Sequence, residues 1–341
     1  MPPYKIDINC GAKAIEAFED ELLIDVLAKN AIYLPSACGS SGKCGLCKVT
    51  VLNDDGPLTD SERKLLSENE LSEKMRLSCQ VKIRSDLQIK IPPEYLGAKE
   101  FTALLKGKTL LTSDIIELTL DIVTPESITF IPGQYITLKC PAYDGKKAVM
   151  RPFSIASSSS QKSSIQLNIR LNRSGTCTPW IFDHLQNGQE VRFSGPRGNF
   201  HLQNTLRPIL FIAGGSGMAP VRSILKTMAE NSIDRKVLFF FGALTEGDLF
   251  YSEEMAELEK QIEDFTYIPA LSNEPSQSSW KGERGLITDV LSRSTESDLS
   301  EYEAYLCGKP AMIEYSLPVL QSKGILRERI FFDLFSPAKI L

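Results

Sequence analysis

The sequence predicts three domains in a row: a small α+β domain, an antiparallel β-barrel, and a doubly wound α/β domain with a parallel sheet. Three observations predict this order. Apolar residues first alternate on either side of one helical stretch, then recur in short runs between proline and glycine turns, and finally form strands that alternate with helices. With 341 residues, the chain is long enough for each domain to bury a core. We expect domains at residues 1–92, 101–205 and 206–341, with a linker over 93–100.

The composition is that of a globular protein, with 42% hydrophobic residues, 24% charged residues and a net charge of −5. A chain with a negative net charge is not attracted to nucleic acid, so nucleic-acid binding is not expected. The most apolar runs, at 208–213 and 237–244, are far shorter than the roughly 20 residues that cross a bilayer, and residues 1–10 lack the apolar centre of a signal peptide. We therefore expect a cytoplasmic protein that does not span a membrane.

The first domain is predicted from five segments. In order, these are an alternating run at 4–10, helical spacing over 22–27, a strand at 49–51, a charged surface helix at 61–70 and a second alternating run at 81–91. Pro92 and Pro93 end the last strand, because proline cannot donate to a β-ladder. This order resembles a small β-grasp domain.

Four of the eight cysteines lie between Cys38 and Cys79 of this first domain, in one loop and at one strand end. Cys38, Cys44 and Cys47 are separated by five and two residues, and Cys79 follows after thirty-one more. Four thiolates suit a [2Fe–2S] cluster, and the small residues at 39–43 allow a loop to wrap it closely. Zinc is the alternative, but structural zinc usually takes two Cys-x2-Cys pairs, and only Cys44 and Cys47 form one. The spacing favours iron–sulfur and a reducing compartment.

The pattern Cys-x5-Cys-x2-Cys with a distant fourth cysteine resembles a plant-type ferredoxin domain. The first gap has four residues in chloroplast ferredoxins and most oxygenase reductases. It has five in the flavin-bearing subunit of the sodium-translocating NADH:quinone reductase, as it does here. Cys10, Cys140 and Cys177 fall outside the motif, and we assign them no role.

The second domain carries a motif at Arg151-Pro152-Phe153-Ser154 that resembles the flavin signature Arg-x-Tyr-Ser of the ferredoxin–NAD(P) reductase superfamily. The resemblance implies that Arg151 pairs with the pyrophosphate, Phe153 stacks on the isoalloxazine and Ser154 reaches the reactive N5 edge. Phenylalanine replaces the usual tyrosine, which preserves stacking and loses a phenol hydrogen bond. We expect FAD, with FMN open if the adenine half has no site.

Two weaker signals follow in the same domain. Asn168 and Arg170 lie where the superfamily has a strand with a basic residue, and Gly175 with Thr178 resembles its Gly-x-x-Ser/Thr phosphate-binding turn. Turn amides and a hydroxyl at a helix start bind anions. The alternative for this turn is an ordinary glycine loop that caps the helix expected over 179–185.

The third domain opens with a glycine turn between a strand and a helix, where phosphates approach backbone amides and the helix dipole. It resembles the superfamily's Gly-Gly-x-Gly-x-Ala-Pro motif, and its expected nucleotide-binding residues are Gly214, Gly215, Gly217 and Pro220. The turn is not Gly-x-Gly-x-x-Gly, because Pro220 stands where the third glycine would be.

The far end of the chain carries the residues expected at the nicotinamide. Cys307-Gly308 with Met312 resembles Cys-Gly-Pro-x-x-Met, which places Cys307 beside the nicotinamide, although Lys309 replaces the usual proline. A buried strand cysteine is the alternative. Phe335 is the candidate for the terminal aromatic that relatives stack on the flavin until nicotinamide displaces it.

The choice of dinucleotide depends on the loop after the second strand of this domain. Glu246 and Asp248 repel a 2′-phosphate and accept from a ribose hydroxyl, so NADH is favoured over NADPH. Simple solvation of two loop carboxylates is the alternative.

Together the motifs resemble the order of bacterial oxygenase reductases and of the quinone-reductase subunit. The resemblance implies an NADH:acceptor reductase in which NADH gives a hydride to FAD and the [2Fe–2S] cluster passes single electrons to an acceptor protein, such as an oxygenase or other metalloenzyme. Ser154, Cys307 and Phe335 are the expected catalytic residues. A peripheral role in a membrane complex stays open. Two alternatives remain: a reductive activator of a metal-cofactor protein, such as a corrinoid protein, and a redox-sensing module without turnover.

Overall fold

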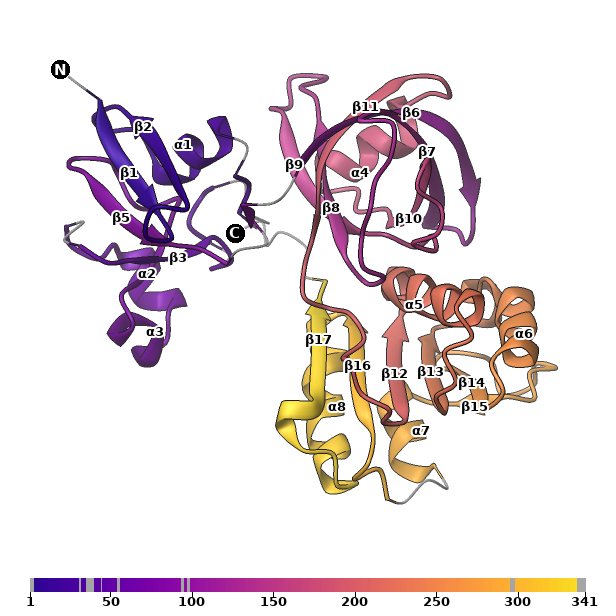
Figure 1. Cartoon of the computed structure of the whole chain (residues 1–341). Coiled ribbons are helices and arrows are strands. Elements are labelled where there is room, and N and C mark those ends of the chain that lie inside the picture. Colours follow the sequence, from indigo (N-terminus) through magenta and orange to yellow (C-terminus); the bar gives the residue numbers. More distant parts are fainter. Residues whose placement is uncertain are drawn as a thin grey trace.

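The computed structural model describes residues 3–30, 32–34, 40–43, 45–53, 56–92, 95–96, 99–294 and 298–335. Figure 1 shows three domains that follow one another along the chain, each built on its own sheet. The predicted fold class is confirmed, whereas the domain boundaries stay predictions. No helix in the described part of the chain is long and apolar enough to cross a membrane.

The first domain is a five-stranded mixed sheet in the order β2-β1-β5-β3-β4. Its strands are β1 (Tyr4–Ile8), β2 (Lys13–Ala17), β3 (Lys48–Val51), β4 (Met75–Leu77) and β5 (Leu87–Lys90), and its helices are α1 (Leu23–Lys29), α2 (Asp60–Leu65) and α3 (Glu68–Ser72). α1 buries its apolar face, including Leu23 and Leu27, in the same core as Ile6 of β1. The β-grasp expectation is confirmed.

The prediction of one charged helix over 61–70 is wrong, because a second helix starts within this range. Thr59 caps α2 with Glu62, and Ser67 caps α3 with Glu70, each pair forming a reciprocal capping box. Leu66 between them is extended, with φ −100° and ψ 136°. A second capping residue, Ser67, therefore divides the predicted helix in two.

The second domain is a six-stranded antiparallel sheet in the order β10-β7-β6-β11-β8-β9. Its strands are β6 (Lys99–Leu110), β7 (Ile115–Thr124), β8 (Tyr135–Cys140), β9 (Val149–Ser154), β10 (Ser164–Arg170) and β11 (Glu190–Arg197), and α4 (Cys177–Pro179) with the π-helical turn η2 (Trp180–His184) lies between the last two. A bridge between Ile155 and Leu167 joins the two ends of the sheet, so the sheet closes into the predicted barrel.

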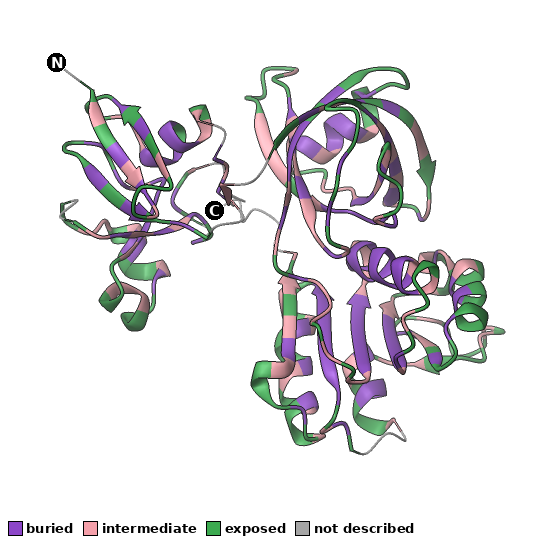
Figure 2. Cartoon of the chain, viewed as in Figure 1, coloured by how far each residue is buried: buried purple, intermediate pink, exposed green. Residues whose placement is uncertain are grey.

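The third domain is a six-stranded parallel sheet in the order β15-β14-β13-β12-β16-β17. Its elements are β12 (Ile209–Gly214), η3 (Gly215–Gly217), α5 (Met218–Glu230), β13 (Val237–Ala243), η4 (Glu246–Asp248), α6 (Ser252–Gln261), β14 (Phe265–Leu271), β15 (Glu283–Arg284), α7 (Ile287–Arg293), β16 (Glu303–Gly308), α8 (Pro310–Ser322), η5 (Arg327–Arg329) and β17 (Ile330–Leu334). One core lies against α5 and α6, and the other against α7 and α8. Figure 2 shows the central strands buried between these layers.

The strand order of this third domain reverses between β12 and β16. From β12 the chain winds outward to β13 and β14, and it later returns to place β16 on the other side of β12. Ligands of open α/β sheets bind at such a switch point, outside the carboxyl ends of the strands. The predicted glycine turn follows β12 and Cys307 lies at the end of β16, so the topology places both at that point.

Candidate functional site

Strand pairing in the first domain brings two of the four predicted cluster ligands to one end of a β-ladder. Lys48 of β3 pairs with Leu77 of β4, and the Ser78 amide just beyond this pair donates to the Cys47 carbonyl at 2.9 Å. Cys47 and Cys79 are both buried, at 1% and 3% exposure. The other two predicted ligands, Cys38 and Cys44, lie outside the described residues.

A carboxamide lies against the Cys79 sulfur. Gln80 Nε2 donates to the Cys79 carbonyl at 3.0 Å and lies 3.6 Å from Cys79 Sγ, within hydrogen-bonding range of sulfur. The same amide packs on Gly42, where a Cβ would come within 2.6 Å of Nε2. Two buried thiols with an N–H donor beside one sulfur fit an iron–sulfur cluster, whose thiolates accept such bonds.

The flavin motif lies on β9, at the edge of the barrel sheet. Arg151 Nη1 donates to the Met150 carbonyl at 2.8 Å and has no carboxylate partner among the described residues. Phe153 is partly buried against the barrel core. Ser154 is 5% exposed, and its Oγ donates to Asp333 Oδ2 of β17 at 3.4 Å. A guanidinium without an acid, an aromatic ring and a buried hydroxyl on one strand fit the flavin assignment.

The predicted phosphate-binding turn is closed by its own hydrogen bonds. The Gly175 amide donates to the Asn172 carbonyl at 3.0 Å, and Thr178 Oγ1 accepts from the Asn172 amide at 2.9 Å and donates to its carbonyl at 3.2 Å. These contacts give Gly175 and Thr178 a local structural role. Their contact with flavin phosphate stays a prediction.

Arg170 joins the barrel to the glycine turn of the third domain. Its Nε pairs with Asp114 at 2.7 Å, and its Nη1 lies so close to the turn that a Cβ on Gly215 would be 3.0 Å away. A cation therefore lies beside the turn expected to hold dinucleotide phosphates. The neighbouring Asn168 accepts from the Tyr251 hydroxyl at 3.0 Å through Oδ1, and its buried Nδ2 has no partner in the described part of the chain.

The glycine turn and the Cys307 strand touch directly. A Cβ on Gly217 would lie 2.2 Å from the Cys307 carbonyl oxygen, so only glycine allows this approach. Gly214 ends β12 and Pro220 lies in the first turn of α5, where its missing N–H costs no helical bond. The structure thus brings together the turn and the strand that the sequence motifs assign to the phosphates and to the nicotinamide of NADH.

Three polar side chains converge where the barrel meets the third domain. Cys307 of β16 pairs in register with Asp333 of β17, and Asp333 accepts from Ser154 of the barrel. Cys307 is fully buried, and burial, followed by the charge of Asp333, raises the pKa of its thiol. The Phe335 amide donates to the Gly308 carbonyl at 2.9 Å, which places the terminal aromatic beside the same strand end.

Asp333 is a site residue that sequence reasoning missed. Burial raises its pKa to about 6, against an opposing hydrogen bond from Ser154. Its only sequence signal is a carboxylate inside the apolar strand Phe331-Phe332-Asp333-Leu334. A partly buried acid between the flavin strand and Cys307 can hold or release a proton near neutral pH.

A second missed group joins the barrel to α5 and α6. Arg222 is 4% exposed, and it pairs with both Glu254 oxygens at 2.6 and 2.7 Å and donates to Gln166 of the barrel at 2.9 Å. Its guanidinium carbon also lies 4.2 Å from the Tyr251 ring centroid. This network fixes the nucleotide domain against the flavin domain.

The two carboxylates assigned to the ribose differ in their surroundings. Asp248 Oδ2 accepts from the Thr245 amide at 2.9 Å and from its hydroxyl at 2.8 Å, so it closes its own turn. Glu246 is exposed, and its amide donates to Glu274. The loop is acidic, as the expected preference for NADH predicts, and the contact of Glu246 or Asp248 with a ribose hydroxyl stays a prediction.

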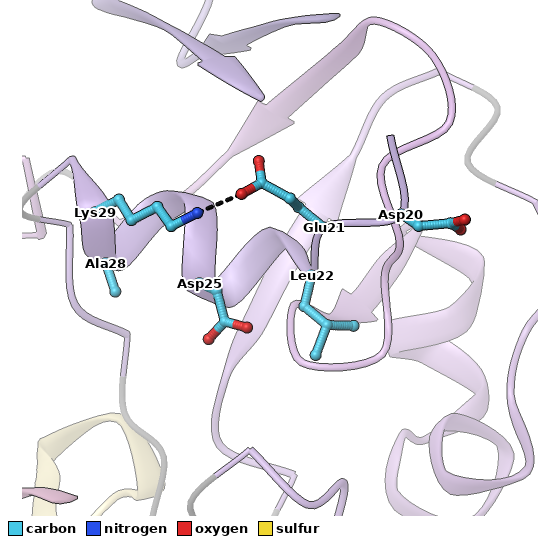
Figure 3. Close-up of a pocket in the computed structure, with 6 residues that line it drawn as sticks. All are labelled: Asp20, Glu21, Leu22, Asp25, Ala28 and Lys29. Atoms are coloured by element: carbon cyan, nitrogen blue, oxygen red, sulfur yellow. Dashed lines mark hydrogen bonds and ion pairs between the residues drawn. The ribbon is translucent and has the colours of Figure 1, made fainter. Parts of the chain in front are cut away.

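A surface hollow on the first domain contains none of the predicted site residues. Figure 3 shows it along α1, where the side chain of Lys29 forms an ion pair with Glu21. Its lining residues are Asp20, Glu21, Leu22, Asp25, Ala28 and Lys29. We assign it no part in the site.

Comparisons with known families agree with this geometry. Residues 6–84 match the 2Fe-2S iron-sulfur cluster binding domain, residues 102–202 the oxidoreductase FAD-binding domain, and residues 211–317 the oxidoreductase NAD-binding domain. Among curated proteins, the chain is 31% identical to the F subunit of the Na(+)-translocating NADH-quinone reductase of Pseudomonas aeruginosa, over 92% of this chain and 86% of that protein. The F subunit of the Neisseria meningitidis enzyme is also 31% identical, with 97% and 91% covered.

Solved structures of similar shape include reductase components. The Amycolatopsis cytochrome P450 reductase GcoB superposes with a TM-score of 0.79 at 25% identity, covering 98% of this chain and 100% of that one. A ferredoxin reductase in carbazole 1,9a-dioxygenase gives a TM-score of 0.73 at 26% identity, with 98% of each chain covered. These likenesses extend over all three domains.

Proposed function

The chain belongs to the family of flavin- and iron–sulfur-dependent NADH oxidoreductases that includes the F subunits of the Na(+)-translocating NADH-quinone reductases, and from this premise we propose that it delivers electrons from NADH to a separate redox protein. The observation that carries the proposal is the convergence of Ser154, Asp333 and Cys307 at the contact between the flavin and nucleotide domains. Hydride transfer needs the two ring systems to meet at such a contact.

Each domain has residues that fit its cofactor. Arg151 and Phe153 would hold FAD, the glycine turn at 214–217 with Arg170 beside it would hold the phosphates of NADH, and the four predicted thiolates would hold the cluster. Bound FAD exchanges two electrons as hydride and releases them singly, and a [2Fe–2S] cluster carries one electron at a time.

The chain's own groups would position the reacting atoms and set the protonation at this contact. The buried Cys307 thiol keeps its proton because burial raises its pKa, so the strand end beside which the nicotinamide would lie carries no thiolate charge. The hydroxyl of Ser154 is held by Asp333, whose raised pKa of about 6 lets that carboxyl gain or lose a proton near neutral pH.

Cluster ligation and electron delivery are tested together by Cys47→Ser, with the exposed Cys10→Ser as the matched control. Ferricyanide accepts electrons from many flavins directly, whereas reduction of cytochrome c is expected to need the cluster. We expect Cys47→Ser to keep NADH-driven ferricyanide reduction and to lose cytochrome c reduction, while Cys10→Ser keeps both. Full cytochrome c reduction by Cys47→Ser would exclude the cluster from the route.

A second candidate for the acceptor is a membrane-bound quinone reductase complex. Identity of 31% over most of the length of the Na(+)-translocating enzyme's F subunit supports it, as does the five-residue first cysteine gap. Capture of the tagged chain from its own cells separates the candidates. Co-purifying membrane subunits support the complex, and an oxygenase or another metalloprotein supports the reductase-component role. A cytoplasmic location stays a prediction.

A further inference from the structure

One side chain of the iron–sulfur domain, Tyr33, contacts two cations of the flavin barrel. Tyr33 lies five residues before the predicted ligand Cys38. Lys139 Nζ of β8 lies 5.2 Å from the centroid of its ring, and the guanidinium carbon of Arg197 of β11 lies 5.3 Å from it. Both distances fall within the range of cation–π attraction.

The Tyr33 hydroxyl takes part in the same contact. It hydrogen-bonds to Glu100 of β6 and to Lys139, and those two residues form an ion pair at 2.5 Å. Burial, followed by the Glu100 bond, raises the pKa of Tyr33, so the phenol stays protonated and can donate. The ring and the hydroxyl of one residue therefore both bind the barrel.

Arg197 is an unusual cation for a contact between domains, because its guanidinium has no exposed surface. Nη1 donates to Thr137 Oγ1 at 2.9 Å, while Nε and Nη2 have no partner in the part of the chain that the structure describes. A buried cation with few hydrogen bonds is costly unless nearby electron-rich groups offset the charge. The Tyr33 ring supplies such a group, with Tyr135 and Tyr95 also facing the charge.

The contact is one strand away from the flavin motif. Arg197 pairs with Tyr135 in the β11–β8 ladder, and Tyr135 pairs with Ser154 in the β8–β9 ladder. Tyr135 is hydrogen-bonded to Tyr95, which precedes β6. The residue that leads into the predicted cluster loop is thus anchored beside the strand that carries the flavin residues.

We propose that Tyr33, held by Lys139 and Arg197, is the positioning residue that docks the iron–sulfur domain on the flavin barrel and sets the gap that electrons cross. The inference rests on the proposed NADH-to-cluster route. Electron tunnelling slows exponentially as the gap widens, so loosening this contact slows the flavin-to-cluster step. Hydride transfer at the contact of Ser154, Asp333 and Cys307 is unchanged, because those residues belong to the barrel and the third domain.

The test uses the full-length holoprotein and three variants. Tyr33→Ala removes the ring, Lys139→Gln removes one cation from the barrel side, and Lys106→Gln is the matched control, because Lys106 forms an exposed ion pair with Asp121 within the barrel. After anaerobic mixing with NADH, flavin bleaching and cluster reduction are followed at separate wavelengths. Hydrogen–deuterium exchange at residues 32–34 and 135–139 is measured in the oxidised protein.

We expect all variants to bleach within about twofold of the native rate. Cluster reduction is expected to slow at least about tenfold in Tyr33→Ala and severalfold in Lys139→Gln, with faster exchange in both segments and no change in Lys106→Gln. Native cluster reduction and native exchange in both test variants overturn the proposal. If Tyr33→Ala loses its cluster, the cluster-reduction rate and the hydrogen exchange of Lys139→Gln decide whether the proposal holds. If the native protein does not bleach with NADH, the proposed function fails, while the exchange data still test the docking contact.

Discussion

Gly217→Ala is expected to weaken NADH binding severely, because the glycine turn and β16 touch at this residue. The new Cβ would lie 2.2 Å from the Cys307 carbonyl oxygen and 2.8 Å from its carbonyl carbon, whereas real Cβ contacts essentially never fall under 3.0 Å. Both neighbours are backbone atoms, so no side chain can rotate away. The turn and the strand must separate by about 1 Å, at a cost of about 1–3 kcal/mol.

That cost corresponds to an increase of about 5- to 140-fold in the dissociation constant for NADH, since about 1.4 kcal/mol is tenfold. Anaerobic titration of flavin reduction and the KM for NADH with ferricyanide measure it. Gly107→Ala is the matched control, because a Cβ there meets no atom within 4 Å. Binding of NADH by Gly217→Ala within about twofold of the control would refute the assignment of this turn to the nucleotide.

Three further predictions concern other parts of the site. Because the pKa of Asp333 is raised from 3.8 to about 6, the folded state binds this proton more tightly than the unfolded chain, so stability is lost as pH rises through that window. This loss of stability is at most about 3 kcal/mol in all, with about half of it between pH 5 and pH 8. Asp333→Asn should remove the loss, so its Tm should fall less than that of the native protein between these two pH values. Equal falls in Tm for the native protein and the variant would contradict the prediction. Gln80→Leu removes the N–H donor near the Cys79 sulfur, so the reduction potential of the cluster should fall by about 30–60 mV. That shift is about a three- to tenfold change in the ratio of reduced to oxidised cluster, and a redox titration measures it. An unchanged potential would count against a role for this donor. Arg222→Met leaves the Glu254 carboxylate without its cation, so the free energy of unfolding should fall by about 3 kcal/mol. Thermal unfolding, followed by flavin release, measures the change. A native Tm would show that the ion pair contributes little to stability.

Local motifs in the sequence indicate most of the candidate site residues, whose contacts with the cofactors stay predictions. The glycine-turn motif predicts Gly217 as a nucleotide-binding residue, and the structure adds a second reason for glycine there, the close approach of the Cys307 backbone. The alternation of strands and helices predicted the parallel sheet, and the structure adds that Cys307 and the glycine turn meet at one edge of it. These features depend on short segments whose residue types carry the signal.

Contacts between distant segments could not be predicted in this way. Asp333 acquires its role from pairing with Cys307 and from Ser154, which is 179 positions earlier in the chain. Arg222 and Tyr33 look like ordinary surface residues until the domains pack. The division of the helix at 61–70 was missed for a different reason, since a serine inside a charged stretch caps a helix only if the chain turns there.

The central claim is that electrons from NADH reach a [2Fe–2S] cluster through FAD within this one chain. The most direct measurement is an anaerobic titration of purified holoprotein with NADH, with flavin absorbance and the electron paramagnetic resonance spectrum recorded on the same samples. We predict flavin bleaching followed by the rhombic signal of a reduced [2Fe–2S] cluster. A flavin that bleaches with dithionite but not with NADH, or thiolates that hold zinc and give no such signal, would contradict the claim.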